Sequence, residues 1–351
     1  MTNDYNIGVA FKVIEEELIA SMIRNMKRHR AWEDKEGFQW EQWQALQLKA
    51  LDEYKKKKQK KYSSQFRDIN DLIVAAIQEA RLQGNMDQEI KILRAIKNGF
   101  KGQKLAKGAT AEFFKLNDRK LNILINATIK DMQKAETAVL RMANDQYRKI
   151  IFNAQVYGNT GAGTYEKAVD MATKNFLSAG LNCIEYANGA RHTISDYSDM
   201  AIRTSSKRAY LQGEGEKRQE WGLHTVIINK RGNPCPKCLP FVGKILIDDV
   251  WSGGSRKDGP YPLMSSAIAA GLYHPRCKDS HTTYFPDIST PPNNKFSRKE
   301  LTEIEKASRQ EERRRYAERQ AYKFERLAKY SLDEENQKKY ENKVKEWKSY
   351  N

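Results

Sequence analysis

This sequence is short of proline over most of its length. No proline occurs before residue 234 or after residue 292, and all nine lie between those positions. Proline removes a backbone donor and clashes inside a helix, so the proline-free stretches, which are rich in Ala, Leu, Ile, Lys, Glu and Gln, favour helices. The distribution therefore predicts a mainly α protein with one irregular segment.

Long apolar runs and a leader pattern are also missing. No stretch of 18 or more apolar residues is present, and the opening MTNDYNIGVAFKVIEEEL has no basic segment followed by an apolar run. The sequence therefore predicts neither a membrane span nor a secretory signal. Cysteine is scarce, with four in 351 residues, and two of these stand as Cys-x-x-Cys. This usage excludes a disulfide framework and indicates a metal site in a reducing compartment.

Negative charge is in deficit, because 62 Lys and Arg residues face 45 Asp and Glu residues, a formal net charge of +17. Such an excess favours polyanionic surroundings: nucleic acid, an anionic membrane surface or an acidic protein. Acidic residues are interleaved almost everywhere, however, so a solvated lysine-rich surface explains the charge equally well. The densest basic run, residues 55–61, is either a phosphate contact without sequence preference or the exposed end of a helix.

Apolar residues recur at steps of three and four along the proline-free N-terminal part, which indicates helices packed on helices. The stripes comprise Leu121, Ile125, Ile129, Met132, Ala135, Val139 and Met142; Ile14, Leu18 and Met22; and Trp43, Leu46 and Ala50. Breaks are expected near Gly37, between Gly99 and Gly108, and at the loop from Tyr157 to Tyr165. That loop contains several glycines but lacks the Gly-Lys-Ser/Thr ending of a P-loop, which favours an interhelical turn.

The C-terminal segment is highly charged. Residues 293–351 carry 17 basic and 12 acidic residues and contain neither proline nor glycine. Ser297 with Glu300, and Ser331 with Glu334, have the spacing of capping boxes and predict two helix starts. The last helix presents an apolar face that we expect to dock on this chain or on another, made of Tyr340, Val344 and Trp347.

The segment from Thr225 to Pro286 has a different character. Residues 225–228 are short and β-branched, and residues 243–247 form a second strand candidate, so a small β unit is expected. Between these two strands lies a turn that contains Cys235 and Cys238. A Cys-x-x-Cys turn directs two thiolates at one ion.

A second pair of ligands follows after 35 intervening residues. His274 and Cys277 repeat the two-residue spacing of Cys235 and Cys238. One nitrogen and three sulfurs form a closed tetrahedral set, which is typical of structural zinc and leaves no open position for catalysis. We predict a structural zinc ion at these four residues, whose removal should unfold the module.

Alternatives to these assignments remain open. His281 is a second choice for the histidine ligand, and Cys235 and Cys238 are alternatively a redox dithiol. Asp248 and Asp249 follow a strand candidate and are candidates for a divalent ion in a nuclease, although acidic pairs there are more often solvated turns.

The chain resembles the minor capsid, or head morphogenesis, proteins of tailed bacteriophages, in particular the second minor capsid protein of siphophages of Gram-positive hosts. The matching segments, in order, are residues 187–192, 201–205, 220–228, 235–238, 243–244, 261–262, 271–277 and 316–320. The His-Pro-x-Cys element at His274 is the most specific of them. The family pattern has a basic residue and then histidine directly after the last cysteine, whereas three residues separate Cys277 from His281 here.

The resemblance implies a virion component that forms in the host cytoplasm, contacts the portal protein or the major capsid protein, and acts in head assembly. It also implies a role in DNA packaging or ejection, with non-specific contact to packaged DNA. A non-enzymatic structural protein is the first hypothesis; a nuclease or ADP-ribosyltransferase-like phage enzyme using Asp248, Asp249 or Arg203, and a zinc-containing nucleic-acid-binding protein, are the alternatives. We expect four parts: an N-terminal helical region (1–110), a central helical domain (111–220), a zinc module (221–290) and a charged helical tail (291–351).

Overall fold

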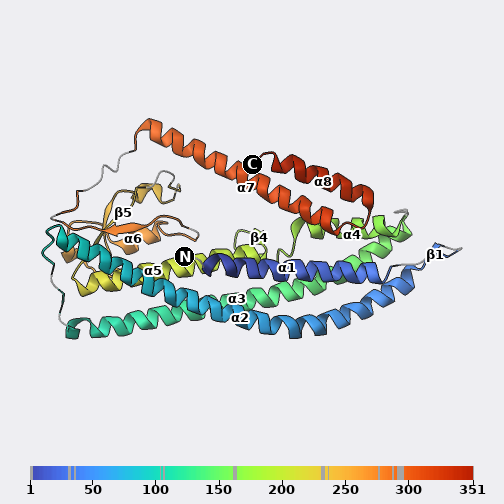
Figure 1. The fold of residues 1–351 in the computed structure, drawn as a ribbon, viewed down its shortest axis with the longest axis horizontal. Helices are drawn as coiled ribbons and strands as arrows, with labels where there is room; N and C mark the ends of the chain where they lie inside the picture. The colour runs from blue at the N-terminus through green and yellow to red at the C-terminus, as the bar shows by residue number, and fades with distance from the viewer. Residues whose placement is uncertain are drawn as a thin grey trace. The chain divides into compact units, whose positions relative to one another are not determined.

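A computed structural model of the chain describes residues 3–30, 33–34, 37–102, 104–105, 107–160, 164–230, 234–235, 237–275, 277–286, 288–290 and 296–350. The helices in this part of the chain are α1 (Asn3–Arg28), α2 (Trp40–Lys97), α3 (Lys107–Asn159), α4 (Tyr165–Ala179), α5 (Ile194–Glu220), α6 (Met264–Ala269), α7 (Arg298–Tyr330) and α8 (Glu334–Lys348) (Figure 1). The strands are β1 (Glu33–Asp34), β2 (Gly37–Phe38), β3 (Ile184–Glu185), β4 (Arg191–His192), β5 (Thr225–Ile228), β6 (Ile245–Ile247) and β7 (His281–Thr283). These elements confirm the predicted mainly α fold with a small α+β module and helical C-terminal residues. None of the described helices is long and apolar enough to cross a membrane.

The predicted apolar stripes and breaks largely agree with the helices. Helices end and begin on either side of the three expected breaks, although residues 161–163 of the glycine loop lie outside the described part. Most stripe residues are buried, including Leu18, Trp43 and Val139. Leu46 was predicted to face a core and is instead 37% exposed, because it lies beside a groove between α1 and α2.

The chain forms two compact units that share its long helices. Unit 1 consists mainly of residues 71–130 and 199–308, and unit 2 consists of residues 5–70, 131–198 and 309–351. Helices α2, α3, α5 and α7 each contribute to both units. The division into four parts that the sequence suggested stays a prediction.

Unit 2 has a helical core in which several buried aromatic side chains hydrogen-bond through their polar atoms. The Tyr165 hydroxyl donates to the Met26 carbonyl at 2.6 Å and accepts from Trp43 Nε1 at 3.2 Å. The Tyr147 hydroxyl donates to Gln47 Oε1 at 2.9 Å. Trp43, Tyr147 and Tyr165 therefore contribute large buried apolar surfaces without leaving their own polar atoms unpaired.

The apolar face of α8 docks on α7 of the same chain, as the antiparallel pair in Figure 1 shows. Trp347 packs edge-on against Tyr316 with ring centroids 5.6 Å apart, and Tyr340 lies 6.3 Å from Phe324. None of the α8 side chains is fully buried. The face expected to bind this chain or another therefore binds, at least in part, this chain.

One predicted capping box is confirmed and the other is wrong. At the start of α7, Glu300 accepts from the Ser297 backbone and the Ser297 hydroxyl accepts from the Glu300 backbone. Helix α8 is instead capped by Asp333, the residue before it, whose carboxylate accepts from the Asn336 backbone. Ser331 does not cap α8, because its hydroxyl donates to the carboxylate of Asp170 on α4.

Unit 1 combines closely packed helices with a three-stranded sheet. Gly84 on α2 and Gly213 on α5 allow the two backbones to meet, since a Cβ at Gly213 would lie 1.9 Å from the Arg81 carbonyl oxygen. The sheet has the order β6-β5-β7 and is antiparallel throughout. The two strands that the sequence predicted are present, and β7 adds a third on the other side of β5.

Candidate metal centre

The first turn of the candidate centre lies between β5 and β6 and carries Cys235 and Cys238. The backbone N–H of Cys238 donates to the Cys235 carbonyl at 3.0 Å and lies 3.4 Å from the Cys235 sulfur. A short 3₁₀-helix begins at Leu239, whose N–H also donates to the Cys235 carbonyl. This tight turn puts both thiols on the same side, as the Cys-x-x-Cys spacing predicts.

The second turn lies between α6 and β7 and carries His274 and Cys277. The Cys277 N–H donates to the His274 carbonyl at 2.9 Å, so this turn repeats the form of the first. Tyr273, just before it, has a φ of +55°, a left-handed conformation that bulky residues rarely adopt and that costs roughly 1–3 kcal/mol. Burial of the Tyr273 ring in the core offsets this strain, and the chain then turns so that His274 faces the first pair.

The two turns converge on each other. Cys235 Sγ lies 2.9 Å from His274 Nε2, and Cys238 Sγ lies 3.4 Å from Cys277 Sγ. Ligand atoms within 4.8 Å of one another form two overlapping triplets, Cys235, Cys238 and His274, and Cys238, Cys277 and Asp279. The first triplet holds three of the four predicted ligands, and the fourth, Cys277, belongs to the second triplet through Cys238. The cluster could therefore bind a metal ion; a tetrahedral zinc ion, with Zn–S bonds of about 2.3 Å, holds its sulfurs about 3.8 Å apart.

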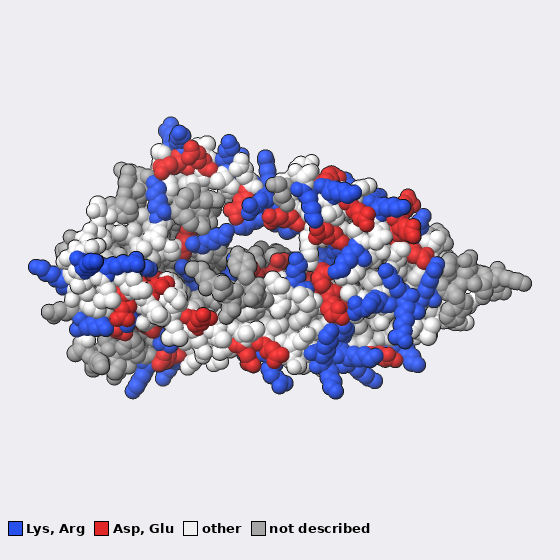
Figure 2. Space-filling view, viewed as in Figure 1, with Lys and Arg blue, Asp and Glu red and all other residues white. Residues whose placement is uncertain are grey.

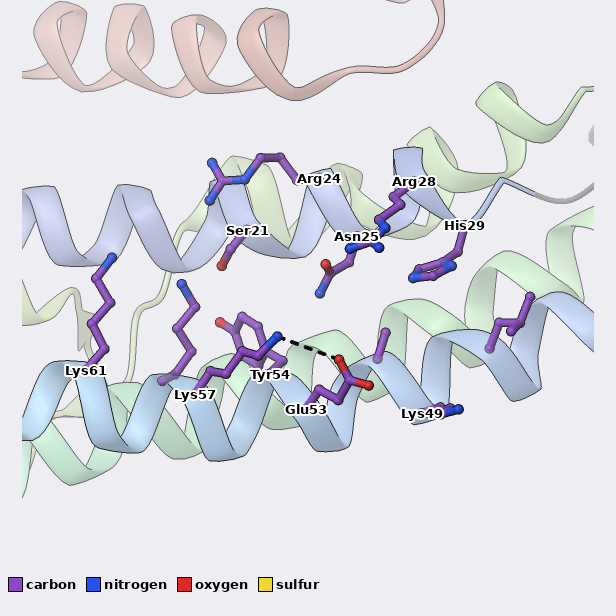
Figure 3. Close-up of a pocket in the computed structure, with 13 residues that line it drawn as sticks. Ser21, Arg24, Asn25, Arg28, His29, Lys49, Glu53, Tyr54, Lys57 and Lys61 are labelled. Atoms are coloured by element: carbon purple, nitrogen blue, oxygen red, sulfur yellow. Dashed lines mark ion pairs between the residues drawn. The ribbon is translucent and has the colours of Figure 1, made fainter.

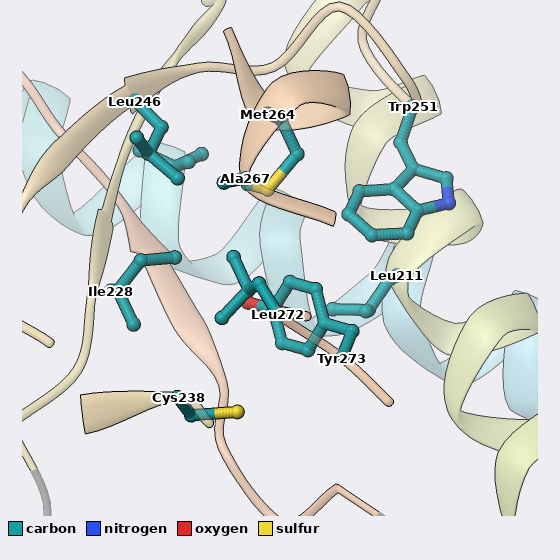
Figure 4. Packing of buried hydrophobic residues seen from close by; sticks show 10 residues of the cluster. Leu211, Ile228, Cys238, Leu246, Trp251, Met264, Ala267, Leu272 and Tyr273 are labelled. Atoms are coloured by element: carbon teal, nitrogen blue, oxygen red, sulfur yellow. The ribbon is translucent and has the colours of Figure 1, made fainter. Parts of the chain in front are cut away.

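Burial sets the chemistry of the thiols. Cys238 is fully buried, and Cys235 and Cys277 pack against a hydrophobic cluster that includes Ile228, Leu272 and other residues drawn in Figure 4. Burial is the main reason that the pKa values of the Cys238 and Cys277 thiols are raised. A reactive dithiol needs the opposite, a lowered pKa, so the surroundings argue against the redox alternative. A bound cation would stabilise the thiolates that burial disfavours.

His274 also has a partner that orients its ring. Its Nδ1 lies 2.8 Å from the Pro275 carbonyl oxygen, which leaves Nε2 directed at the cysteines. A hydrogen bond of this kind fixes the tautomer of a metal-binding histidine, because the nitrogen that donates cannot also bind the ion. The arrangement therefore suits His274 as a ligand through Nε2.

A family comparison adds to this geometry. The family model described as phage minor capsid protein 2 matches residues 6–350, nearly the whole chain. The chain belongs to this phage minor capsid family. No curated protein and no solved structure matches it. Membership in a phage minor capsid family implies a structural, non-enzymatic role in the virion.

In this minor capsid protein, His281 lies in a separate buried network. Arg218 Nη2 is 3.1 Å from His281 Nε2, and the Tyr273 hydroxyl is 2.7 Å from His281 Nδ1. Arginine can only donate, so Nε2 accepts and the neutral ring donates from Nδ1 to Tyr273. Burial, followed by the charge of Arg218, holds the pKa of His281 well below its usual value. Both ring nitrogens are thus engaged away from the cysteine cluster.

The acidic candidates also have internal structural partners. Asp248 is fully buried, accepts from Arg218 Nη2 at 2.7 Å, and accepts from the Trp251 backbone at 2.8 Å. Asp249 accepts from the Ser265 backbone in the first turn of α6. Arg203 donates to Asp199 one helical turn away. These contacts assign Asp248 and Asp249 to the framework of the module.

Sequence reasoning missed the two members of this network that lie in a polar stretch of α5, Arg218 and Glu214, whose Oε2 is 3.9 Å from His281 Nε2. Glu214 and Arg218 are 2% and 0% exposed, although the sequence Gly213-Glu-Gly-Glu-Lys-Arg218 looks solvated. The signal was the two glycines: Gly213 faces the α2 backbone, and a Cβ at Gly215 would lie 2.4 Å from Cβ of Trp251. Glycines inside a helix otherwise rich in charge indicate a face pressed against neighbouring chain.

Proposed function

We propose that this chain is a minor structural protein of a bacteriophage head that acts in head assembly near the portal and takes part in DNA packaging or ejection. The observation that carries the proposal is the minor capsid family match over residues 6–350. The protein would form in the host cytoplasm and remain in the virion.

The proposal includes a structural zinc ion bound by Cys235, Cys238, His274 and Cys277. Its support is the approach of the two turns, with a sulfur and a nitrogen 2.9 Å apart and two sulfurs 3.4 Å apart. Four protein ligands close the coordination sphere, so the ion would hold the loops of unit 1 together and supply no chemistry. Asp279 lies close to Cys277, with Oδ2 3.8 Å from the sulfur, and is the competing fourth ligand.

Contact with the portal protein or the major capsid protein is supported by an exposed apolar stripe on α2 within unit 1. Leu82, Met86, Ile90 and Leu93 recur at steps of four and three, and each is at least 47% exposed. Other apolar residues of α2 in unit 1 are buried, namely Ile73, Ile77 and Ile92. Docking of the outer stripe on another virion protein would remove a contiguous apolar surface from water.

Mass spectrometry of purified virions tests the proposed role. We expect this chain in the particle at a few copies relative to the major capsid protein. A photo-crosslinking residue at Met86 should attach to the portal protein or the major capsid protein, whereas one at the exposed Lys339 of α8 serves as the matched control. Absence of the chain from infectious particles would refute the role.

A further inference from the structure

A groove with mostly cationic walls lies in unit 2, between the C-terminal half of α1 and the first half of α2. Its volume is about 490 Å³. Arg24, Arg28 and His29 line it from α1 and the residue after it, and Lys49, Lys57 and Lys61 line it from α2. In Figure 3, His29 and Lys61 point into the space between the two helices. The surface view shows Lys and Arg side chains gathered over these two helices (Figure 2).

The positive charge of this groove is poorly compensated. Six cations line it, and Glu53 is the one carboxylate among the lining residues, so the formal charge of the lining is +5. Glu17 lies beside the groove, where it bonds Arg24 at 2.9 Å and stands 3.7 Å from both Lys58 and Lys61. One further carboxylate still leaves an excess of four positive charges in a confined space. A concave surface of one sign concentrates its field and attracts counter-ions.

Lys58 shows the cost of this crowding. Its side chain lines the groove and is only 12% exposed, with Nζ 5.6 Å and 5.3 Å from the ring centroids of Tyr54 and Tyr62. Burial is the main cause that lowers the pKa of Lys58, and the charges of Lys61 and Arg24 lower it further. An anion bound in the groove would offset both effects.

The chemistry of the lining favours a linear phosphate polymer over a protein. A protein partner needs an apolar anchor site that becomes fully dry, and the apolar lining here is limited to Leu46, Ala50 and Tyr54. Lys49 and Lys61, the outermost cations of α2 in the lining, are twelve positions apart, which is about 18 Å of helix. Along one strand of duplex DNA, at about 3.4 Å per phosphate, that length accommodates about five phosphates.

We propose that this groove is a sequence-independent binding site for the phosphodiester backbone of nucleic acid, held by Arg24, Arg28, Lys49, Lys57 and Lys61. The site deepens the proposed virion role, since DNA is the abundant polyanion of a phage head. It also gives the basic run at residues 55–61 a location: Lys57, Lys58 and Lys61 line the groove.

Fluorescence anisotropy with the full-length protein and a labelled DNA duplex of about 30 base pairs, at roughly 50 to 200 mM salt, tests the site. The test variant is Arg28→Gln/Lys49→Gln/Lys57→Gln, which removes three exposed cations. The matched control, Arg313→Gln/Arg314→Gln/Arg315→Gln, removes three exposed cations from α7, where Glu311 and Glu318 pair with two of them. Circular dichroism establishes that both triples keep the wild-type helicity, and Lys57→Glu alone serves if the test triple does not fold.

The groove variant should bind DNA at least about tenfold more weakly, and the slope of log K against log salt should fall by about three. The control should stay within about twofold of wild type. The same measurement is made with single-stranded RNA. An equal loss of RNA affinity in the groove variant supports recognition of the phosphodiester backbone, whereas binding to DNA but not to RNA shows that the site is specific for duplex DNA.

Three results would overturn the site: unchanged affinity in the groove variant, an equal loss in both triples, or competition by polyglutamate that matches DNA at equal charge. The measurement is independent of the virion role. If the protein is absent from particles but still binds DNA through the groove, the proposed function is refuted and this inference is not.

Discussion

Different kinds of interaction stabilise the interior of each of the two units. The module in unit 1 has strands of four, three and three residues, long loops, and buried charges such as Arg218 and Asp248. Unit 2 has long helices whose apolar and aromatic side chains fill its core, with Trp43 and Tyr147 fully buried. Helical backbone satisfies its own hydrogen bonds, whereas loops require side chains or an ion to fix them. The comparison teaches that the irregular part of the chain depends on a few specific polar contacts and the helical part on many apolar ones.

Metal removal should have the largest effect, and it should unfold the module of unit 1 while unit 2 stays folded. Structural zinc contributes apparent binding free energies of about 10–16 kcal/mol, comparable with the stability of a whole domain. A strong chelator, or Cys238→Ser, should therefore abolish hydrogen-exchange protection in β5, β6 and β7. Protection in α4 of unit 2 should remain. Cys183→Ser is the control, since Cys183 lies outside the cluster, and uniform loss of protection in both units would break the comparison.

The buried ion pair is expected to be the second support of the module. Asp248→Ala leaves the Arg218 charge buried without its partner and should lower the free energy of unfolding by about 3–5 kcal/mol. The double variant Arg218→Met/Asp248→Leu should lose clearly less of the free energy of unfolding, because it removes both charges and leaves neither one buried alone. Chemical denaturation followed by tryptophan fluorescence measures both. A double variant as unstable as the single one would show that the charges themselves are required.

Unit 2 should respond to pH through a buried carboxyl. Burial raises the pKa of Glu136 to about 7 from an ordinary value of 4.5, and the side chain is 7% exposed. The pKa of this carboxyl is higher in the folded protein than in the unfolded chain. Its stabilising contribution to the free energy of unfolding is therefore complete below pH 4.5 and is lost as the pH rises towards 7. Glu136→Gln should become more stable relative to wild type by about 3 kcal/mol between pH 4.5 and pH 8. Parallel pH profiles of the two proteins would contradict this.

The smallest effect concerns one hydroxyl in the helical core. Tyr165→Phe keeps the ring but removes the donor to Met26 and the acceptor for Trp43, at an expected cost of about 1–3 kcal/mol. Thermal unfolding of the full chain measures it. Tyr316→Phe on α7, where the ring is 49% exposed, should change stability by less than about 0.5 kcal/mol and provides the control. Equal losses would mean that the core of unit 2 does not depend on its internal hydrogen bonds.

Sequence reasoning succeeded where local rules decide the structure. Apolar periodicity located the helices, the proline distribution located the module, and paired Cys and His spacings identified the side chains that meet. It failed where distant groups compete for one side chain. Ser331 looked like a helix cap until Asp170 supplied a carboxylate from α4, and Leu46 looked like a core residue although its face of α2 borders the cationic groove. Strand β7 has only three residues, so its pairing with β5 carries no periodic signal.

Metal analysis of the purified full-length protein tests the central claim most directly. Elemental analysis should find one zinc per chain, and close to none after His274→Ala and Cys277→Ser are introduced together, while Cys183→Ser keeps the full complement. A wild-type protein that folds without any bound metal, with β5, β6 and β7 protected from exchange, would contradict the account.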